Sequence, residues 1–264
     1  MRPSLLALLT AGAVLSATAL PAFADQNTLT ILQQGSGNAL SVDQSAATNS
    51  EVKGLSITSG EPTAGSGLAP GNRKLNELGL EITLTDEARQ LGNNNDATVT
   101  MSGNGGKVYL YQNNPAIGPS GGVKGNSAEI NSLAGGVGLV SQDGIGNVAN
   151  LTVTGGLGGD PALIVGGQRI DGAIIQRGSG NYGTVITGSS TDALLVQNGS
   201  SNKGALDVTG SVPGSSVVFT QNGNNMNSAA AAQVYTNVTN GTVSVTQNSF
   251  SSVGAQVSVT QTAR

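Results

Sequence analysis

The 264-residue sequence contains no cysteine and no histidine, and aromatic residues make up only 3% of it. Disulfides are therefore excluded, and so is the side chain that most often serves as a general base or zinc ligand near neutral pH. A metal centre would have to rest on carboxylates, and no paired set at a useful spacing stands out. We therefore expect a protein that is not an enzyme, with no catalytic residue, no metal and no cofactor.

Charge is also scarce, since charged residues make up 10% of the chain and the net charge is -4. Phosphate binding needs a basic surface, so nucleic acid is not an expected partner. A low charge suits the stacking of similar strands, because like charges placed one above another at the ~4.7 Å strand spacing repel each other.

What the sequence has in abundance is glycine, with 40 residues, and a recurring phrase, Gln-x-Gly-x-x-Asn. Its clearest copies begin at Gln33, Gln90, Gln142, Gln176 and Gln197. Apolar and polar residues alternate before and after each copy, with the period of two that is typical of a half-buried strand. A strand, a corner and a second strand thus form one unit. Because one such unit cannot bury its apolar face alone, the units must stack, which predicts an all-β, parallel β-solenoid.

Three further copies are less regular. The corner after Gln112 is stretched before Asn126 resumes the pattern, and the corner after Gln221 is expected to hold about one extra residue, which aligns Asn227 with the row of asparagines. The corner after Gln247 has serines in place of Gly and Asn, and residues 255–261 are expected to supply its second arm. Insertions are expected at corners, where they face solvent.

The repeated residues have a physical role in this arrangement. An amide both donates and accepts hydrogen bonds, so stacked glutamines or asparagines can bond in a ladder, while glycine suits a corner that needs positive φ. The alternative is that the amides are merely polar residues at strand ends. The predicted ladder residues are Gln33, Gln90, Gln112, Gln142, Gln176, Gln197, Gln221 and Gln247 with Asn38, Asn95, Asn126, Asn147, Asn181, Asn202 and Asn227, and the corner glycines are Gly35, Gly92, Gly144, Gly178, Gly199 and Gly223.

The fuller phrase Gln-x-Gly-x-x-Asn-x-Ala-x-x-x-Gln resembles the repeat of the curlin family, secreted bacterial subunits of amyloid fibres. It is clearest at Gln33, Gly35, Asn38 and Gln44, and at Gln221, Gly223, Asn227, Ala229 and Gln233, and about eight copies extend from Leu29 onward. The resemblance implies a structural subunit of curli-like extracellular fibres that support biofilm matrix, adhesion and cell aggregation. Its implied partners are further copies of itself, a second curlin-like subunit and an outer-membrane export channel.

Two alternatives remain open. The closing glutamine is often replaced, for example by Met101 or Val153, and the units are unevenly spaced, which leaves room for a minor, nucleating subunit of the same fibre. A monomeric solenoid, either an adhesin or an ice-binding protein, is the alternative of a different class. Outward threonine pairs such as Thr98 and Thr100 could form its flat surface.

The organisation of the chain begins with a predicted signal peptide over residues 1–24, where Arg2 and an apolar run precede a small-x-small site and cleavage after Ala24. A membrane anchor is the alternative, but the run is short for a bilayer and no later segment could span one as a helix. We therefore expect a secreted protein. Residues 25–90 hold the first repeat and a charged, loop-rich segment, with residues 60–72 as a loop or linker. Residues 84–264 form the repeat solenoid, with insertions near 113–125 and 155–172 that either cap the stack or are tolerated surface loops.

Two ligand motifs are discounted. The stretch Gly178–Gly183 satisfies the dinucleotide fingerprint, but it lies between two expected strands with no helix to receive a pyrophosphate. The stretch Gly155–Asp160 resembles a single calcium-binding nonapeptide, whereas that architecture needs tandem copies.

Overall fold

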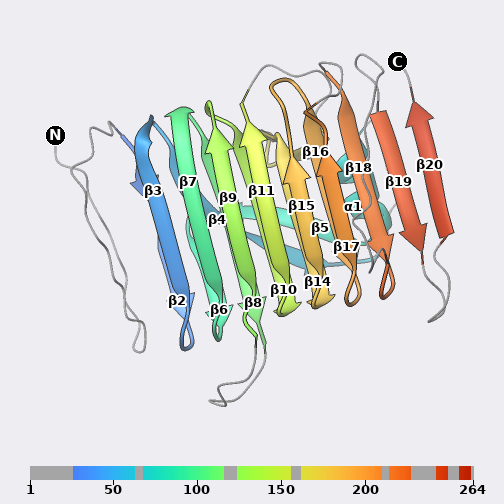
Figure 1. The fold of residues 1–264 in the computed structure, drawn as a ribbon, viewed down its shortest axis with the longest axis horizontal. Coiled ribbons are helices and arrows are strands. Elements are labelled where there is room, and N and C mark those ends of the chain that lie inside the picture. The colour runs from blue at the N-terminus through green and yellow to red at the C-terminus, as the bar shows by residue number, and fades with distance from the viewer. Residues whose placement is uncertain are drawn as a thin grey trace.

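The chain winds between two facing β-sheets. The computed structural model describes residues 26–62, 68–115, 124–155, 162–209, 214–226, 242–248 and 256–262. These residues form a 12-stranded sheet (sheet A), a six-stranded sheet (sheet B), a two-stranded hairpin and, within this described part, one helix. Sheet B lies in front of sheet A in Figure 1, with successive strands side by side from the N-terminal to the C-terminal end. The predicted all-β, parallel solenoid-like fold is confirmed.

Each turn of the chain contributes one strand to sheet A and one to sheet B, and we call such a pair a rung. In sheet A, β1 with β2 belongs to rung 1, β4 with β6 to rung 2, and β8, β10, β14, β16, β18 and β19 to rungs 3 to 8. The strands of sheet A are β1 (Thr28–Leu29), β2 (Ile31–Gln34), β4 (Glu51–Ser59), β5 (Leu80–Thr85), β6 (Ala88–Gly92), β8 (Lys107–Asn114), β10 (Val137–Ile145), β14 (Gly172–Ser179), β16 (Asp192–Asn198), β18 (Ser216–Asn222), β19 (Thr242–Asn248) and β20 (Gln256–Thr262).

Sheet B is wholly parallel and follows the same order. Its strands are β3 (Ala39–Thr48), β7 (Asp96–Asn104), β9 (Ser127–Leu133), β11 (Val148–Thr154), β15 (Tyr182–Ile186) and β17 (Lys203–Asp207), for rungs 1 to 6. The second arm expected after Gln221 begins at Asn227, and residues 227–241 lie outside the described residues.

The core between the sheets is built from alternate residues of every strand, as the period of two predicts. Val140, Ile174 and Leu195 from sheet A meet Val99, Leu151 and Leu206 from sheet B, and all six are at most 1% exposed. Because these residues are mostly Val, Ile, Leu and Ala, the two sheets pack through short aliphatic side chains.

Two expectations about the strands are corrected. The largest insertion, residues 55–87, does not fall at a corner but splits the sheet A strand of rung 2, so that Glu51–Gly54 and Arg89–Gly92 both pair with β8. The chain leaves and returns at Gly54, where a Cβ would lie 1.6 Å from the carbonyl oxygen of Glu87, so only glycine fits. The final arm, β20, does not join sheet B; it pairs antiparallel with β19 at the edge of sheet A.

The outer face of sheet A is covered by the chain itself. The end of β4, helix α1 (Pro70–Glu77), β5 and the hairpin of β12 (Leu163–Val165) and β13 (Gln168–Ile170) form what we call the cover. Pro70 lies in the first turn of α1, where its missing N–H costs nothing. Figure 1 shows α1 and β5 behind the two sheets. The cover and the outer face share a second apolar cluster: Leu55, Leu75, Leu80, Tyr109, Val137, Leu139, Leu163, Val165, Ile170, Ala173, Ile175, Leu194, Val196 and Val218.

The cover corrects the expectation that residues 60–72 form only a loop or linker and that the insertion near 155–172 either caps the stack or is a surface loop. Residues 70–72 begin α1, and the insertion of residues 55–87 is bonded to the insertion near 155–172. Gly71 N donates to Ala162 O at 2.6 Å, and the Asn72 side chain both donates to Ile164 O and accepts from Ile164 N. The apolar side chains of the cover pack on the outer face of sheet A, which is itself apolar over its middle strands.

No helix among the described residues is long and apolar enough to cross a membrane.

Candidate functional site: the amide rows and the ends of the stack

The eight predicted glutamines lie in register along sheet A, each paired with the next across seven neighbouring strand pairs. Gln33 Nε2 donates to Gln90 Oε1, and each later glutamine up to Gln221 donates in the same direction to the next one. The six remaining bonds, from Gln90 through to Gln247, measure 2.8 to 2.9 Å. Gln90, Gln112, Gln142, Gln176, Gln197 and Gln221 are fully buried.

Each inner glutamine also ties the two sheets together. The second hydrogen of its Nε2 goes to the first carbonyl of the sheet B strand in the preceding rung, as in Gln142 to Ser127 O and Gln176 to Val148 O, both at 2.9 Å. Equivalent bonds of 2.7 to 3.0 Å start from Gln90, Gln112, Gln197 and Gln221. Because one hydrogen is directed along the row and the other across it, the amide orientation is determined and the row has a direction.

The asparagines form a second row at the corners. Asn147 Oδ1 accepts from the backbone N and the side-chain Nδ2 of Asn181, both at 3.1 Å, and Asn147 Nδ2 donates to Gly178 O at 2.9 Å. The backbone N–H of Asn95, Asn126, Asn147, Asn181 and Asn202 donates in this way to the preceding asparagine. Each asparagine thus joins the corner of its own rung to the corner of the next rung.

The corner glycines are required by crowding between rungs. Gly178 has φ +107°, and a Cβ built on it would lie 2.1 Å from the carbonyl oxygen of Gly199 in the next rung. Gly35, Gly92, Gly144 and Gly199 have equally close carbonyl neighbours, and Gly223 also has positive φ. In rung 3 the corresponding position holds Asn114, the last residue of β8 before the insertion. A side chain at the other corners would force the rungs apart.

The structure corrects the alignment of rung 7. The corner after Gln221 has no extra residue: Met226 N donates to Asn202 Oδ1 at 3.1 Å, and Met226 O accepts from Lys203 N, as the asparagines of inner rungs do. Met226 therefore occupies the position predicted for Asn227, which lies outside the described residues. A methionine carries no amide, so the repeat phrase alone could not show that the row continues through its backbone.

Two features of the corners were missed. The residue before each corner asparagine except Asn126 has positive φ even when it is not glycine, as at Asn94 (φ 57°) and Ser201 (φ 58°). The residue after each glutamine forms a partial outer row, in which Asn113 donates to Asp143 at 2.9 Å and Asn222 donates to Asn248 at 3.2 Å. The signal was present in the frequent Gly, Asn and Asp at these positions.

No protein-family model, no curated protein and no solved structure matches this chain. The physical arrangement of its own residues therefore carries the functional argument.

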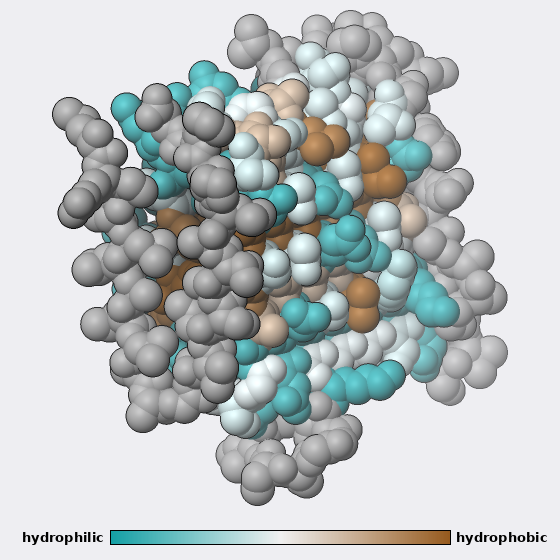
Figure 2. Space-filling view, turned by 60° about the vertical axis from the view of Figure 1, so that its left-hand side comes forward, coloured by the Kyte–Doolittle hydropathy of each residue, from teal (hydrophilic) through white to brown (hydrophobic). Residues whose placement is uncertain are grey.

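The two ends of the stack differ. At the N-terminal end the inward residues Leu29, Ile31, Leu40 and Val42 are only partly buried, whereas their counterparts in rung 2, Ala97 and Val99, are at most 1% exposed. Figure 2, which brings this end forward, shows apolar side chains at the surface there, while most of the visible outer face is polar. At the other end Val243 and Val245 of β19 are 5% exposed, and β20 pairs with β19.

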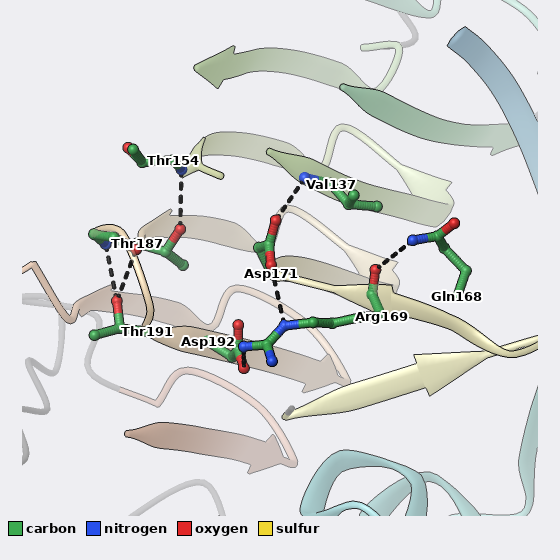
Figure 3. Close-up of polar contacts among 9 residues, drawn as sticks. Val137, Thr154, Gln168, Arg169, Asp171, Thr187, Thr191 and Asp192 are labelled. Atoms are coloured by element: carbon green, nitrogen blue, oxygen red, sulfur yellow. Dashed lines mark hydrogen bonds and ion pairs between the residues drawn. The ribbon is translucent and has the colours of Figure 1, made fainter. Parts of the chain in front are cut away.

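A charged cluster fastens the cover to the strands beneath it. Arg169 of β13 lies between Asp171 and Asp192, which stand side by side at the starts of neighbouring strands (Figure 3). Its Nη2 bonds Asp192 Oδ2, its Nε lies 3.4 Å from Asp171 Oδ1, and Asp171 Oδ2 accepts from Val137 N at 2.8 Å. Burial raises the pKa of Asp192 to about 7, with Asp171 adding to the rise while Arg169 opposes it. Burial also raises the pKa of Asp171. Arg169 thus bridges two stacked carboxylates that would otherwise repel each other.

Proposed function

We propose that this chain is a secreted structural subunit of curli-like extracellular amyloid fibres, which grow as copies stack end to end. The observation that carries the proposal is the glutamine row, in which seven successive contacts repeat one in-register pairing with the same side chain on both sides. Because each rung pairs with the next through the same residues, the end rung of one copy can pair in the same way with the end rung of a second copy.

The mechanism follows from the edge strands. In the described part of the chain, rung 1 has sheet neighbours on one side only, so the outer N–H and C=O groups of β2 and β3 could pair with another chain. A docked rung would bury the partly exposed Leu29, Ile31, Leu40 and Val42 and would extend both sheets. Growth by this route is nucleated, seeded and hard to reverse.

The resemblance to curlins supplies the biological setting of the proposal. Fibres of this kind would contribute to biofilm matrix, surface adhesion and cell aggregation, and the chain would leave the cell through an outer-membrane channel. Such a fibre needs no catalytic group, in line with a chain that contains neither histidine nor cysteine.

The experiment is seeded thioflavin fluorescence on the purified chain from Asp25 onward at micromolar concentration, with fibre diffraction of the product. A lag that seeds abolish, with reflections near ~4.7 Å and ~10 Å, is the expected result. A chain that stays monomeric with a β-rich circular dichroism spectrum refutes self-assembly. A monomer that nevertheless shortens the lag of a curlin fibre subunit would indicate the minor, nucleating subunit.

The ice-binding alternative receives no support from the outer face of sheet B. Thr98 and Thr100 are followed in the next rung by Glu129 and Asn131, so the rows mix threonine with a carboxylate and an amide. A ranked threonine surface would repeat threonine from rung to rung.

A further inference from the structure

On the outer side of rung 1, Gln33 carries one half of the contact that stacked glutamines make with each other. Because Gln33 donates to Gln90, its Oε1 faces away from the stack, and no donor among the described residues contacts this oxygen. The second Nε2 hydrogen of Gln33 lacks the cross-sheet carbonyl that every inner glutamine has, since that carbonyl belongs to a preceding rung. A rung docked here would supply both partners.

The last strand of the parallel stack is β19, and β20 occupies its outer edge. The pairing of β20 with β19 is antiparallel and places Val257 opposite Gln247 and Gln261 opposite Val243. The register thus sets a glutamine opposite a valine at two positions. Every contact between rungs instead places glutamine beside glutamine.

Parallel docking of rung 1 on β19 removes this mismatch. Aligning Gln33 with Gln247 places Ile31 beside Val245 and Leu29 beside Val243, so apolar residues meet apolar residues and the amides meet each other. This is the pairing that β18 already makes with β19 on the opposite edge. The new contact therefore repeats an interface present within the chain.

We propose that the first rung of one copy docks in parallel on β19 of a second copy and displaces β20, which closes that edge in the single chain. The proposal rests on the proposed fibre function and deepens it by naming the contact between copies. The contact is head to tail and does not close on itself, so it generates an open filament. Head-to-head docking of two first rungs would set the Oε1 acceptors of two Gln33 side chains against each other.

The chain lacks cysteine, so single engineered cysteines report this contact directly. In the proposed register Gln34 lies beside Asn248, and neither side chain is buried. Fibres grown from an equal mixture of Gln34→Cys and Asn248→Cys chains should form a covalent heterodimer on oxidation, because adjacent strands lie within disulfide reach. The matched control replaces Asn248→Cys by Asn198→Cys, an exposed position in the same outer row inside the stack, and should give no heterodimer.

The outcomes separate this contact from the function on which it rests. Absence of fibres refutes the proposed function itself. Fibres that yield Gln34→Cys homodimers indicate head-to-head contact, and fibres that yield no cross-link place the contact elsewhere; both results overturn the docking proposal while leaving the fibre function intact.

Displacement of β20 is tested by two opposite changes. The double variant Val257→Pro with Ser258→Pro removes two adjacent N–H groups, so at least one bond to β19 is lost whichever residue makes it, and elongation on wild-type seeds should be several times faster. Val257→Gln places an amide opposite Gln247, should strengthen the closed edge and should slow elongation. Slower growth of the proline variant, or faster growth of the glutamine variant, overturns the role of β20.

Discussion

Replacing Gln176 by leucine removes an inner link of the glutamine row that makes three side-chain hydrogen bonds. The side chain accepts from Gln142 Nε2 at 2.9 Å and donates to Gln197 Oε1 and Val148 O at 2.8 and 2.9 Å. Leucine has a similar size but no polar group, so two buried glutamines and the partly buried carbonyl of Val148 each lose a bond. Each such loss costs ~1–3 kcal/mol, and burial of the leucine side chain recovers ~1.5–3 kcal/mol. We expect a net destabilisation of about 3 kcal/mol.

The assay is urea denaturation of the freshly purified monomer, followed by circular dichroism, together with seeded growth. A loss of this size should lower the urea midpoint by about 1 M. Gln33→Leu, at the open end of the row with a single ladder bond, should cost about 1 kcal/mol. Gln34→Leu, on an exposed side chain of the same strand, is the matched control and should change stability by less than ~0.5 kcal/mol. If Gln176→Leu behaves like this control, the row does not stabilise the stack.

Three other changes test the corner, the charged cluster and the cover. Gly178→Val should slow seeded growth and lower the urea midpoint far more than Ser179→Val, because only the glycine has a carbonyl 2.1 Å from its Cβ position; equal effects would contradict the corner assignment. Burial raises the pKa of Asp192 from 3.8 to about 7, so the folded chain holds a proton that the unfolded chain releases. The stability from this carboxyl is complete below pH ~4 and is lost as the pH rises to 7, by at most about 4 kcal/mol, and Asp192→Asn should flatten that dependence in pH-resolved denaturation. Leu75→Ala should cost ~2–4 kcal/mol and speed proteolysis of the cover, whereas Glu77→Ala, on the exposed side of α1, should do neither.

The repeating part of the fold could be predicted from local pattern because each rung obeys the same physical rule. Alternation placed Val140 and Ile174 in the core, and the spacing from Gln to Asn placed Gln142 and Asn147 at the two ends of a corner. Rung 7 resisted the same rule, since Met226 fulfils the asparagine role through its backbone alone. A pattern of side chains cannot report a function that the main chain performs.

The cover could not be predicted, for a different reason. Its apolar residues, such as Leu55, Leu75 and Ile170, come from short segments far apart in the sequence, none long enough to show a period. The target of the cover was hidden as well, since the outward residues Tyr109, Leu139 and Ile175 simply lengthen apolar runs in their strands. Likewise, only tertiary structure brings Arg169 between Asp171 and Asp192.

The cover also sets the axial repeat of a filament built from these chains. In a stack of nearly identical rungs, nothing in the ~4.7 Å spacing marks where one copy ends and the next begins. The cover occurs once per chain and lies on one flank only, so it would recur every eight rungs, about 38 Å along the axis. Fibres would then show a meridional reflection near ~38 Å and two unlike sides in electron micrographs. Bundles could grow only through the flank that the cover leaves bare.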